Sequence, residues 1–253
     1  MESQPPLSAA YFDAWYADMD RSPVKDQIQR RHLHLPPHLS STSSLTGDGL
    51  DEVCAALRLL PGNVLLDLAC GRGGYGLEIA TRTRSRLIGI DFSPEAVRQA
   101  ARKARDLSVA ADFRVGDLVG TGLGSASVDA VMCVDSIQFA DGPAEAFAEI
   151  RRVLAPGGPV VLTCWEPVER GDERLVSRLR DVDLDAGLRA AGFEEIAVAE
   201  RPGWRAAELG MWKEAAALDP GDDPALLSFH TEALRVLETA HLLRRVMAVA
   251  NAP

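Results

Sequence analysis

The segment from Val64 to Ala80, VLLDLACGRGGYGLEIA, constrains the fold more than any other part of the chain. An apolar run of β-forming residues ends in Asp67, a glycine-rich loop follows, and a segment with helical periodicity comes after it. This order predicts a strand, a tight turn and the N-terminus of a helix. Glycines in such a turn let a ligand approach the peptide groups closely. We therefore expect a nucleotide-like ligand to bind to the backbone of this loop.

Two classes of cofactor fit the glycines of the loop. The spacing Gly71-x-Gly73-x-x-Gly76, with Asp91 twenty residues after Gly71, matches the fingerprint of dinucleotide-binding proteins. An NAD(P)-dependent oxidoreductase is therefore one interpretation. Asp67 argues against it, because its carboxylate, four residues before the first glycine, would repel a pyrophosphate lying on the loop. The same carboxylate would attract a cationic ligand.

The run Asp67-x-Ala69-x-Gly71-x-Gly73 resembles the first motif of the class I S-adenosylmethionine (SAM)-dependent methyltransferases, whose ligand carries an ammonium and a sulfonium. Ala69 stands where this family usually has its first glycine. We expect a negative φ at this position, which alanine tolerates. The resemblance extends over about residues 57–163 and includes the turn LAPGG at residues 154–158.

Strand and helix patterns alternate from Val64 onward, which predicts a parallel sheet. A return segment joins the last two strands at one edge, so we expect the final strand to run antiparallel. The predicted fold class is α/β: a Rossmann-like, seven-stranded, mostly parallel sheet with strand seven antiparallel, helices on both faces and a helical cap. The expected strands lie at residues 64–67, 86–91, 111–115, 128–134, 159–164, 195–200 and 245–250.

Helical patterns flank the sheet-forming segment. An aromatic stripe at residues 11–19 marks a first helix, Ser22 followed by Pro23 caps a second helix, and Asp48 caps a third that runs to Leu60. The expected organisation is an N-terminal helical cap segment at residues 1–60, a SAM-binding Rossmann-like core at 61–203, a helical insertion at 204–243 and a final core strand at 244–253.

Carboxylates stand at the ends of four predicted strands. Asp67, Asp91 and Asp117 end the first three strands, and Asp135 follows the fourth. Ligands of open α/β sheets bind outside the carboxyl ends of the strands, so these side chains should converge on one crevice. The resemblance implies the following cofactor contacts: Asp67, Ala69, Gly71 and Gly73 at the methionyl ammonium, Asp91 at the ribose hydroxyls, Phe92 at the adenine ring, Asp117 and Leu118 at the adenine amino edge, and Cys133 near the methionyl group.

The amino-acid composition argues against some classes of binding partner. The formal net charge of -10 argues against nucleic acid and anionic membranes, because phosphate binding needs clustered Lys and Arg. A small-molecule substrate is therefore expected. No apolar run approaches the roughly 18 residues needed to span a membrane, and residues 1–6 lack a signal-peptide pattern, so we expect a cytoplasmic protein. The four cysteines form no CxxC pair, which predicts free thiols without zinc or disulfides.

The resemblance implies transfer of a methyl group from SAM, with S-adenosylhomocysteine as the second product. Such an in-line displacement depends mainly on orientation of the reacting atoms. The uncharged surroundings of the flanking helices favour an aromatic or lipophilic, secondary-metabolite-like acceptor. The expected acceptor contacts are Tyr11, Trp15, Tyr16, Gln138, Trp165 and Trp212.

A general base is needed only if the acceptor presents a hydroxyl or a carbon acid. The catalytic candidates are His34, His230 and Asp135. No metal is expected, although Asp135 and Asp141 are an alternative pair of ligands for a divalent ion in a catechol-type reaction. A protein that binds SAM or another small molecule without catalysis also remains open. We expect a monomer or a homodimer.

Overall fold

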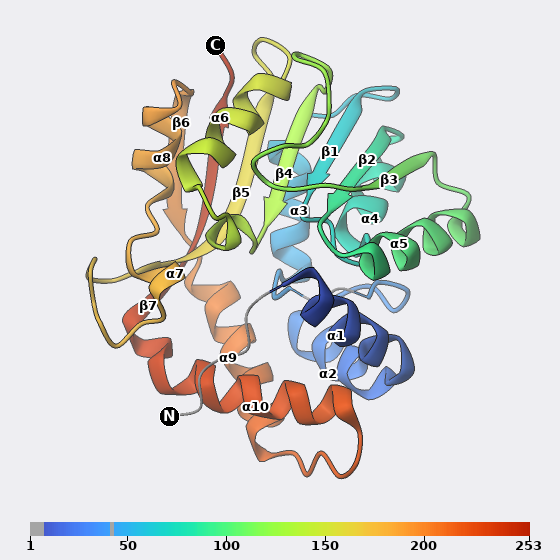
Figure 1. Cartoon of the computed structure of the whole chain (residues 1–253), viewed down its shortest axis with the longest axis vertical. Helices are drawn as coiled ribbons and strands as arrows, with labels where there is room; N and C mark the ends of the chain where they lie inside the picture. Colours follow the sequence, from blue (N-terminus) through green and yellow to red (C-terminus); the bar gives the residue numbers. More distant parts are fainter. Residues whose placement is uncertain (1–7, 41–42) are drawn as a thin grey trace.

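One sheet organises the computed structural model, which describes residues 8–40 and 43–253. Its strands are β1 (Val64–Leu68), β2 (Arg86–Asp91), β3 (Ala111–Val115), β4 (Ala130–Val134), β5 (Pro159–Pro167), β6 (Glu194–Glu200) and β7 (Leu243–Asn251). They pair in the order β3-β2-β1-β4-β5-β7-β6 (Figure 1). The first five strands run parallel to one another, whereas β7 is antiparallel to both β5 and β6. The predicted fold class is therefore confirmed, including the antiparallel seventh strand.

The helices surround the sheet on three sides. They are α1 (Ala9–Arg21), α2 (Pro23–Leu33), α3 (Gly47–Ala56), α4 (Gly74–Thr83), α5 (Pro94–Leu107), α6 (Pro143–Val153), α7 (Ser177–Arg180), α8 (Leu184–Ala190), α9 (Pro202–Ala217) and α10 (Pro224–Thr239), with 3-10 turns η1 (Ile137–Phe139) and η2 (Ala240–Leu242). Helices α3, α4 and α5 pack on one face of the sheet, and α6 and α8 pack on the other. Beyond the carboxyl ends of the central strands lie α1, α2, α9 and α10, which we call the helical cap (Figure 1).

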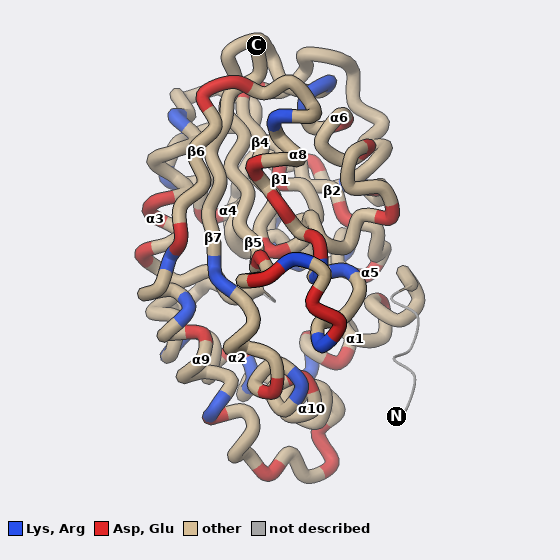
Figure 2. Tube along the Cα trace, turned by 90° about the vertical axis from the view of Figure 1, so that its left-hand side faces the viewer, with Lys and Arg blue, Asp and Glu red and all other residues tan. Residues whose placement is uncertain are grey.

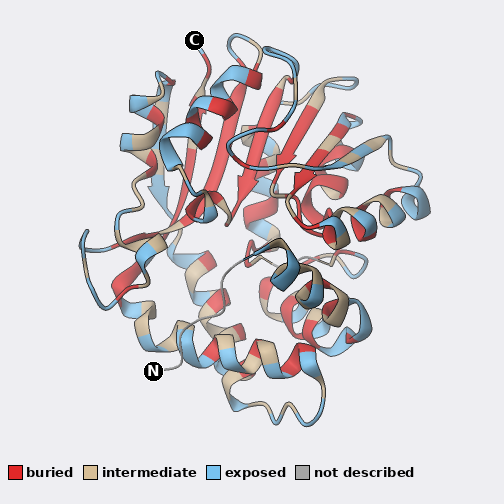
Figure 3. Cartoon of the chain, viewed as in Figure 1, coloured by how far each residue is buried: buried red, intermediate tan, exposed pale blue. Residues whose placement is uncertain are grey.

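Neighbouring residues of the central strands alternate between two hydrophobic cores. Leu65 packs in the cluster that contains Val53 and Ile79, whereas Leu66 packs in the cluster that contains Phe147. Side chains alternate across a strand, so a strand buried on both faces is apolar throughout. Figure 3 shows these central strands as the most continuously buried part of the chain. Each fully buried leucine contributes about 1.5 to 3 kcal/mol, which makes the sheet a rigid base for the site.

Two predicted helix caps differ in the structure. Thr46 caps α3, because its Oγ1 accepts a hydrogen bond from the Gly49 amide at 3.0 Å. Asp48 therefore lies in the first turn, and the helix ends at Ala56 instead of Leu60, so this prediction is wrong. Ser22 does stand at the N-cap position of α2, but its hydroxyl donates to Asp223 at 2.6 Å and makes no cap bond. A contact with a distant loop replaces the local one.

Several element boundaries also shift. Strand β4 begins at Ala130, two residues later than expected, and Val128 forms only an isolated bridge with Leu154. Strand β5 continues to Pro167 because β7 pairs with it along its whole length. Helix α9 begins at Pro202, slightly ahead of the expected insertion.

The helical cap joins two segments that are far apart in the sequence. The Trp15 indole N–H donates to the Ser228 hydroxyl at 3.0 Å, and the His32 ring contacts Glu214 at 2.6 Å. Helices α1 and α2 therefore form one layer with α9 and α10 (Figures 1 and 2). Residues 1–7 and 41–42 of the expected N-terminal segment lie outside the described residues. Among the described helices, none has both the length and the apolar character that crossing a membrane requires.

Candidate functional site

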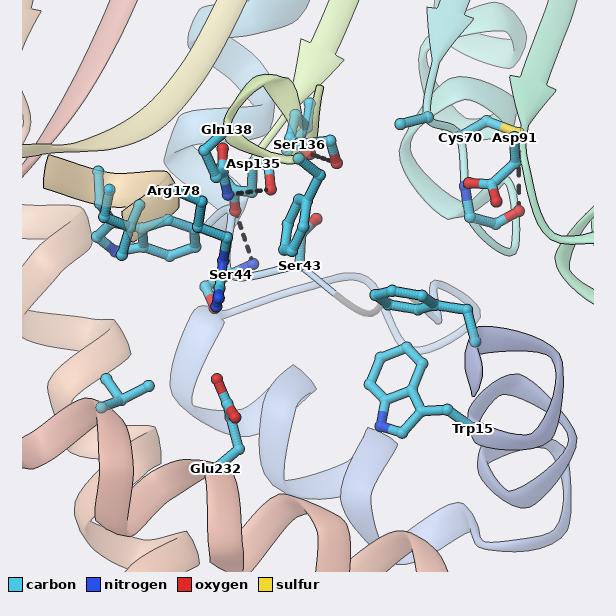
Figure 4. A pocket seen from close by; sticks show the side chains of 18 of the residues that line it. Trp15, Ser43, Ser44, Cys70, Asp91, Asp135, Ser136, Gln138, Arg178 and Glu232 are labelled. Carbon is cyan, nitrogen blue, oxygen red and sulfur yellow. Dashed lines mark hydrogen bonds between the residues drawn. The ribbon is translucent and has the colours of Figure 1, made fainter. Parts of the chain in front are cut away.

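A cavity of about 610 Å³ lies between the carboxyl ends of the central strands and the helical cap (Figure 4). The strand ends contribute carboxyl groups to it, and the cap contributes aromatic rings. The structure thus brings together most of the expected cofactor contacts and all of the expected acceptor contacts. These residues are Asp67, Ala69, Gly71, Asp91, Phe92, Asp117 and Leu118, and Tyr11, Trp15, Tyr16, Gln138, Trp165 and Trp212.

The loop between β1 and α4 turns through residues with positive φ. The values are 59° at Ala69, 52° at Gly71 and 74° at Gly73. A left-handed backbone costs a residue with a Cβ atom about 1 to 2 kcal/mol, whereas glycine adopts it freely. The expectation of a negative φ at Ala69 is therefore wrong. Alanine occupies a strained position that suits glycine.

Replacing Ala69 by glycine is expected to raise the free energy of unfolding by about 0.5 to 1 kcal/mol. Relief of the left-handed strain, about 1 to 2 kcal/mol, outweighs the loss of a half-buried methyl group. Urea denaturation measures the change. The matched control is Ala80→Gly inside α4, which should lower stability by about 1 kcal/mol. A destabilised Ala69→Gly variant would contradict the assignment of strain.

Asp91 ends β2 with its carboxyl group fixed in place. Its Oδ2 accepts a hydrogen bond from the Gly71 amide at 2.8 Å, and its Oδ1 accepts one from the Ser93 amide at 3.0 Å. Burial raises the pKa of this carboxyl, while the bonds from Ser93 and Gly71 act in the opposite direction. Each carboxylate oxygen has a second lone pair. Two acceptors of fixed orientation are therefore left for paired hydroxyl groups such as those of a ribose.

Asp67 lies deeper, next to the loop. Burial, reinforced by the neighbouring Asp91 charge, raises its pKa to about 8, although the Gly76 amide donates a hydrogen bond to it. A Cβ atom on Gly76 would lie 2.4 Å from the Asp67 Oδ2, so only glycine allows this approach. A cationic ligand would restore the ionised form of the carboxyl. The structure therefore provides Asp67 as a place for an ammonium group.

SAM affinity is expected to rise with pH from about pH 6 to about pH 8. In that window the unliganded protein carries a proton on Asp67, and binding of a cation releases it. Each unit of pH should then change the dissociation constant by up to about tenfold. Because the folded-state pKa is raised, the unliganded protein should also lose stability as pH rises from about 4 to about 8.

Isothermal titration in two buffers of different ionisation enthalpy counts the released proton. Asp67→Asn, which cannot ionise, should bind SAM more weakly and without this pH dependence. An affinity of the wild-type protein that stays flat across the window would contradict the role of Asp67.

Aromatic side chains form the part of the cavity wall next to the expected adenine contacts. Phe92 packs against Phe12 with ring centroids 5.1 Å apart, and Phe12 also contacts Phe139 at 6.2 Å. Leu118 is buried beside them, whereas Asp117 is exposed and accepts a hydrogen bond from the Val119 amide. Phe12 and Phe139 are additions to the expected set. Phe12 belongs to the aromatic stripe of the sequence, but Phe139 has no distinguishing signal.

Two expected cofactor contacts do not line the cavity. Gly73 caps α4, and a Cβ atom there would lie 3.0 Å from Ala100 and Phe113, so packing explains this glycine. Cys133 is fully buried inside β4, and the following residue, Val134, lines the cavity instead. Both corrections follow from side-chain alternation along the strand and from helix packing.

The two histidine candidates lie outside the cavity. His34 follows the last residue of α2 with φ 54° and lines a separate pocket together with Trp204. The Nδ1 atom of His230 lies 3.0 Å from the Ala215 carbonyl, within the contact between α9 and α10. The structure therefore corrects the expectation that these histidines act as a base in this site.

Asp135 lines the cavity but is held in a buried ion pair. Its carboxylate contacts the Arg245 guanidinium at 2.6 Å and 2.7 Å, and it accepts hydrogen bonds from Thr163 at 2.6 Å and from the Ser44 amide at 3.0 Å. Arg245 is 0% exposed. Both oxygens of this carboxylate already pair with Arg245 or accept hydrogen bonds, so Asp135 is a poor candidate for a base.

The expected tryptophans belong to the same buried network. Trp165 and Trp212 donate their indole N–H groups to Glu208 at 3.0 Å and 3.1 Å, and the guanidinium of Arg245 lies 4.2 Å from the Trp165 ring centroid. Burial raises the pKa of Glu208, and Arg245 opposes that change. Helix α9 of the cap is thereby attached to β5 and β7 at the cavity wall.

Other candidate chemistry is limited. Within residues 8–40 and 43–253, no group of three His, Cys, Asp or Glu residues is arranged to hold a metal ion. The four cysteines are free thiols. The sequence did not predict two charged residues of the cavity, Lys25 and Arg178. A single cationic residue on a helix cannot be distinguished by sequence pattern from a charged residue on the surface.

Comparison with known proteins assigns the family. Residues 65–158 match a family of methyltransferase domains. The demethylmenaquinone methyltransferase of Deinococcus radiodurans is 30% identical over 174 residues, which cover 63% of this chain and 71% of that protein. The chain belongs to the class I SAM-dependent methyltransferases. SAM is the cofactor of this family, in agreement with the carboxyl groups that Asp67 and Asp91 present to the cavity.

Solved structures of this methyltransferase fold cover most of the chain. The cyclase SpnF is 26% identical with a TM-score of 0.69, over 81% of this chain and 80% of that one. Phosphoethanolamine N-methyltransferase 2 of Haemonchus contortus, in complex with SAM, has a TM-score of 0.74 at 18% identity, over 94% of this chain and 60% of that one. The matches to several other curated relatives span only about a third of their length.

Proposed function

We propose that this methyltransferase transfers the methyl group of SAM to a small acceptor with an aromatic or otherwise apolar body. The observation that carries the proposal is a single cavity that joins the carboxyl groups of Asp67 and Asp91 to an aromatic wall built by the helical cap (Figure 4). One compartment suits the ammonium and the ribose of the donor. The other has room and apolar surface for a second molecule.

The acceptor half of the cavity is built mainly from the cap. Trp15 comes from α1, Trp212 from α9 and Phe229 from α10. We propose that residues 1–60 and 204–243 act together as the acceptor-binding cap on a core of residues 61–203, completed by the final strand at residues 244–253. Enclosure of this kind excludes water and orients the acceptor.

The charge of the protein and its similarity to a known methyltransferase also support a small acceptor. Lys and Arg residues are interspersed with Asp and Glu along the trace in Figure 2, and the formal net charge is -10. Phosphate backbones require concentrated positive charge. The relative from Deinococcus radiodurans is named for a quinone-type acceptor, demethylmenaquinone, which has an aromatic or lipophilic character like the proposed acceptor.

The chain's own residues provide orientation and electrostatics. Asp67 would hold the ammonium of the donor, and Asp91 its ribose hydroxyls. When bound, SAM supplies an activated methyl group on a sulfonium. The rigid carboxyl ends of β1 and β2 fix one reactant, and the cap fixes the other. Orientation of this kind can contribute about 7 to 11 kcal/mol to a bimolecular reaction.

A second candidate is a protein that binds SAM without transferring its methyl group. The observation in its favour is the similarity to SpnF, a protein of the same fold that is named a cyclase. The cavity geometry is compatible with both candidates, because both need the donor and the acceptor compartments.

Formation of S-adenosylhomocysteine separates the two candidates. The purified protein is incubated with SAM and a panel of phenols, amines and carboxylic acids, and mass spectrometry follows the demethylated donor and the methylated acceptor. Acceptor-dependent formation of both products supports the methyltransferase. SAM binding without turnover on any acceptor class supports the second candidate.

A further inference from the structure

Lys25 is a buried cation in the wall of the cavity. It lies on α2, is 3% exposed and lines the same cavity as Asp67 and Asp91. Its Nζ lies 5.5 Å from the Trp15 ring centroid and 5.4 Å from that of Phe229. Its hydrogen bond goes to the neutral Gln29 Oε1 at 2.9 Å. Within the described residues, no carboxylate forms an ion pair with it.

Hydrogen bonds place Lys25 near the donor compartment. Gln29 donates to the Ser43 carbonyl at 3.4 Å, and the Tyr75 hydroxyl lies 3.2 Å from the same carbonyl and 3.0 Å from that of Leu45. Tyr75 lies in the first turn of α4, beside Gly76, whose amide donates to Asp67. Through Gln29 and Tyr75, the amine of Lys25 is therefore linked to α4, the helix that begins at the cofactor loop.

The charges around Lys25 favour its neutral form. Burial lowers its pKa to about 7, the Arg72 charge acts in the same direction, and Asp26 opposes them. Arg72 and Asp26 pair with each other at 2.6 Å, which limits what Asp26 contributes to Lys25. After proton uptake, the ring faces of Trp15 and Phe229 stabilise the ammonium.

The other candidates for a general base are less suited than Lys25 to accept a proton from an acceptor in the cavity. His34 and His230 lie outside the cavity, Asp135 is committed to its ion pair, and Asp67 lies beside the cofactor loop. A buried lysine near a reacting group is a known type of general base. Among the described residues that line the cavity, Lys25 is the only lysine.

We propose that Lys25 is the general base of this methyltransferase and that its acceptor is a phenol or an enol, bound with its hydroxyl group at Nζ. The acceptor O–H bond breaks as its proton forms an N–H bond with the lone pair of Nζ. The oxygen lone pair then forms the bond to the methyl carbon, whose bond to sulfur breaks with its electrons on sulfur. The ammonium later returns the proton to water. The proposal rests on the proposed methyl transfer.

Kinetics of two Lys25 variants test the proposal. Lys25→Arg carries a permanent positive charge and cannot accept a proton, and Lys25→Met removes the amine. On a phenol that is neutral at assay pH, both variants should lose about 100-fold or more in kcat with a smaller change in KM. The rise of wild-type kcat with pH should disappear. On a nitrophenol that is already ionised, Lys25→Arg should keep near-wild-type kcat.

The matched control is Lys103→Met. Burial also lowers the pKa of Lys103, to about 8, but its Nζ donates to Ser40 and it does not line the cavity. This variant should keep the wild-type kcat on both phenols. Equal losses of Lys25→Arg on the neutral and the ionised phenol, or no loss on either, would overturn the proposal.

Chemical trapping tests Lys25 independently of turnover. Benzaldehyde and borohydride are added to the SAM-bound protein, and peptide mass spectrometry locates the modified amines. At about pH 7, Lys25 should be labelled faster than the exposed Lys213, because a neutral amine forms the imine. Absence of labelling at Lys25 would overturn the proposal. Labelling in a protein that transfers no methyl group to any acceptor would show that the proposed function has failed while the reactive amine exists.

Discussion

Replacing Arg245 by methionine is expected to lower the free energy of unfolding by about 3 to 5 kcal/mol. Arg245 is 0% exposed and pairs with Asp135, which is also buried. Removal of the guanidinium leaves the buried Asp135 carboxylate without its charged partner. The loss should also loosen the cap, because Glu208 of α9 contacts the same guanidinium at 3.7 Å.

Urea denaturation of the two proteins measures this difference. The control is Arg189→Met, which removes an exposed pair with Asp185 and should change stability by less than about 1 kcal/mol. Adding Asp135→Asn to Arg245→Met should recover part of the loss, because no buried charge then remains unpaired. An Arg245→Met variant with the stability of the control would contradict this account of the network.

Replacing Asp91 by alanine is expected to weaken SAM binding by about 1.5 to 3 kcal/mol, or about 10- to 150-fold in the dissociation constant. Both oxygens are oriented by backbone amides, so the carboxylate meets the ribose hydroxyls without further ordering. The variant also leaves the Gly71 amide without its acceptor, which should loosen the cofactor loop.

Isothermal titration with SAM measures the affinity, and circular dichroism confirms that the variant is folded. The matched control is Asp112→Ala, an exposed aspartate on β3 that pairs with Arg114 outside the cavity. Its affinity should match the wild type. Unchanged SAM affinity in a folded Asp91→Ala variant would refute the assignment of Asp91 to the ribose.

Local pattern was sufficient for the sheet and for the convergence of carboxyl groups at the ends of its strands. Apolar runs, turn residues and proline at helix starts are properties of neighbouring residues, so the strands and most helices could be read from them. The convergence of Asp67, Asp91, Asp117 and Asp135 could also be predicted, because parallel strands all end at the same edge. The antiparallel β7 follows from the long return through α9 and α10.

The backbone at Ala69 and the role of Ser22 required the tertiary structure. The left-handed φ of Ala69 is imposed by the turn from β1 into α4, and alanine itself prefers the opposite sign. Ser22 has the sequence signature of a cap, but Asp223, on a loop 201 positions away, takes its hydroxyl. Local preference is weak enough for one distant contact to override it.

The contacts that join the helical cap to the sheet were decided by packing between distant segments. Arg245 and Asp135 are 110 residues apart, and Trp15 meets Ser228 across 213 residues. Sequence periodicity places a side chain on a helix face but does not say which other face it meets. The histidines that the sequence offered as bases therefore lie outside the cavity. Lys25 belongs to no sequence motif, yet it lies in the cavity wall. Its burial and its aromatic neighbours determine its chemistry, and both come from the tertiary structure.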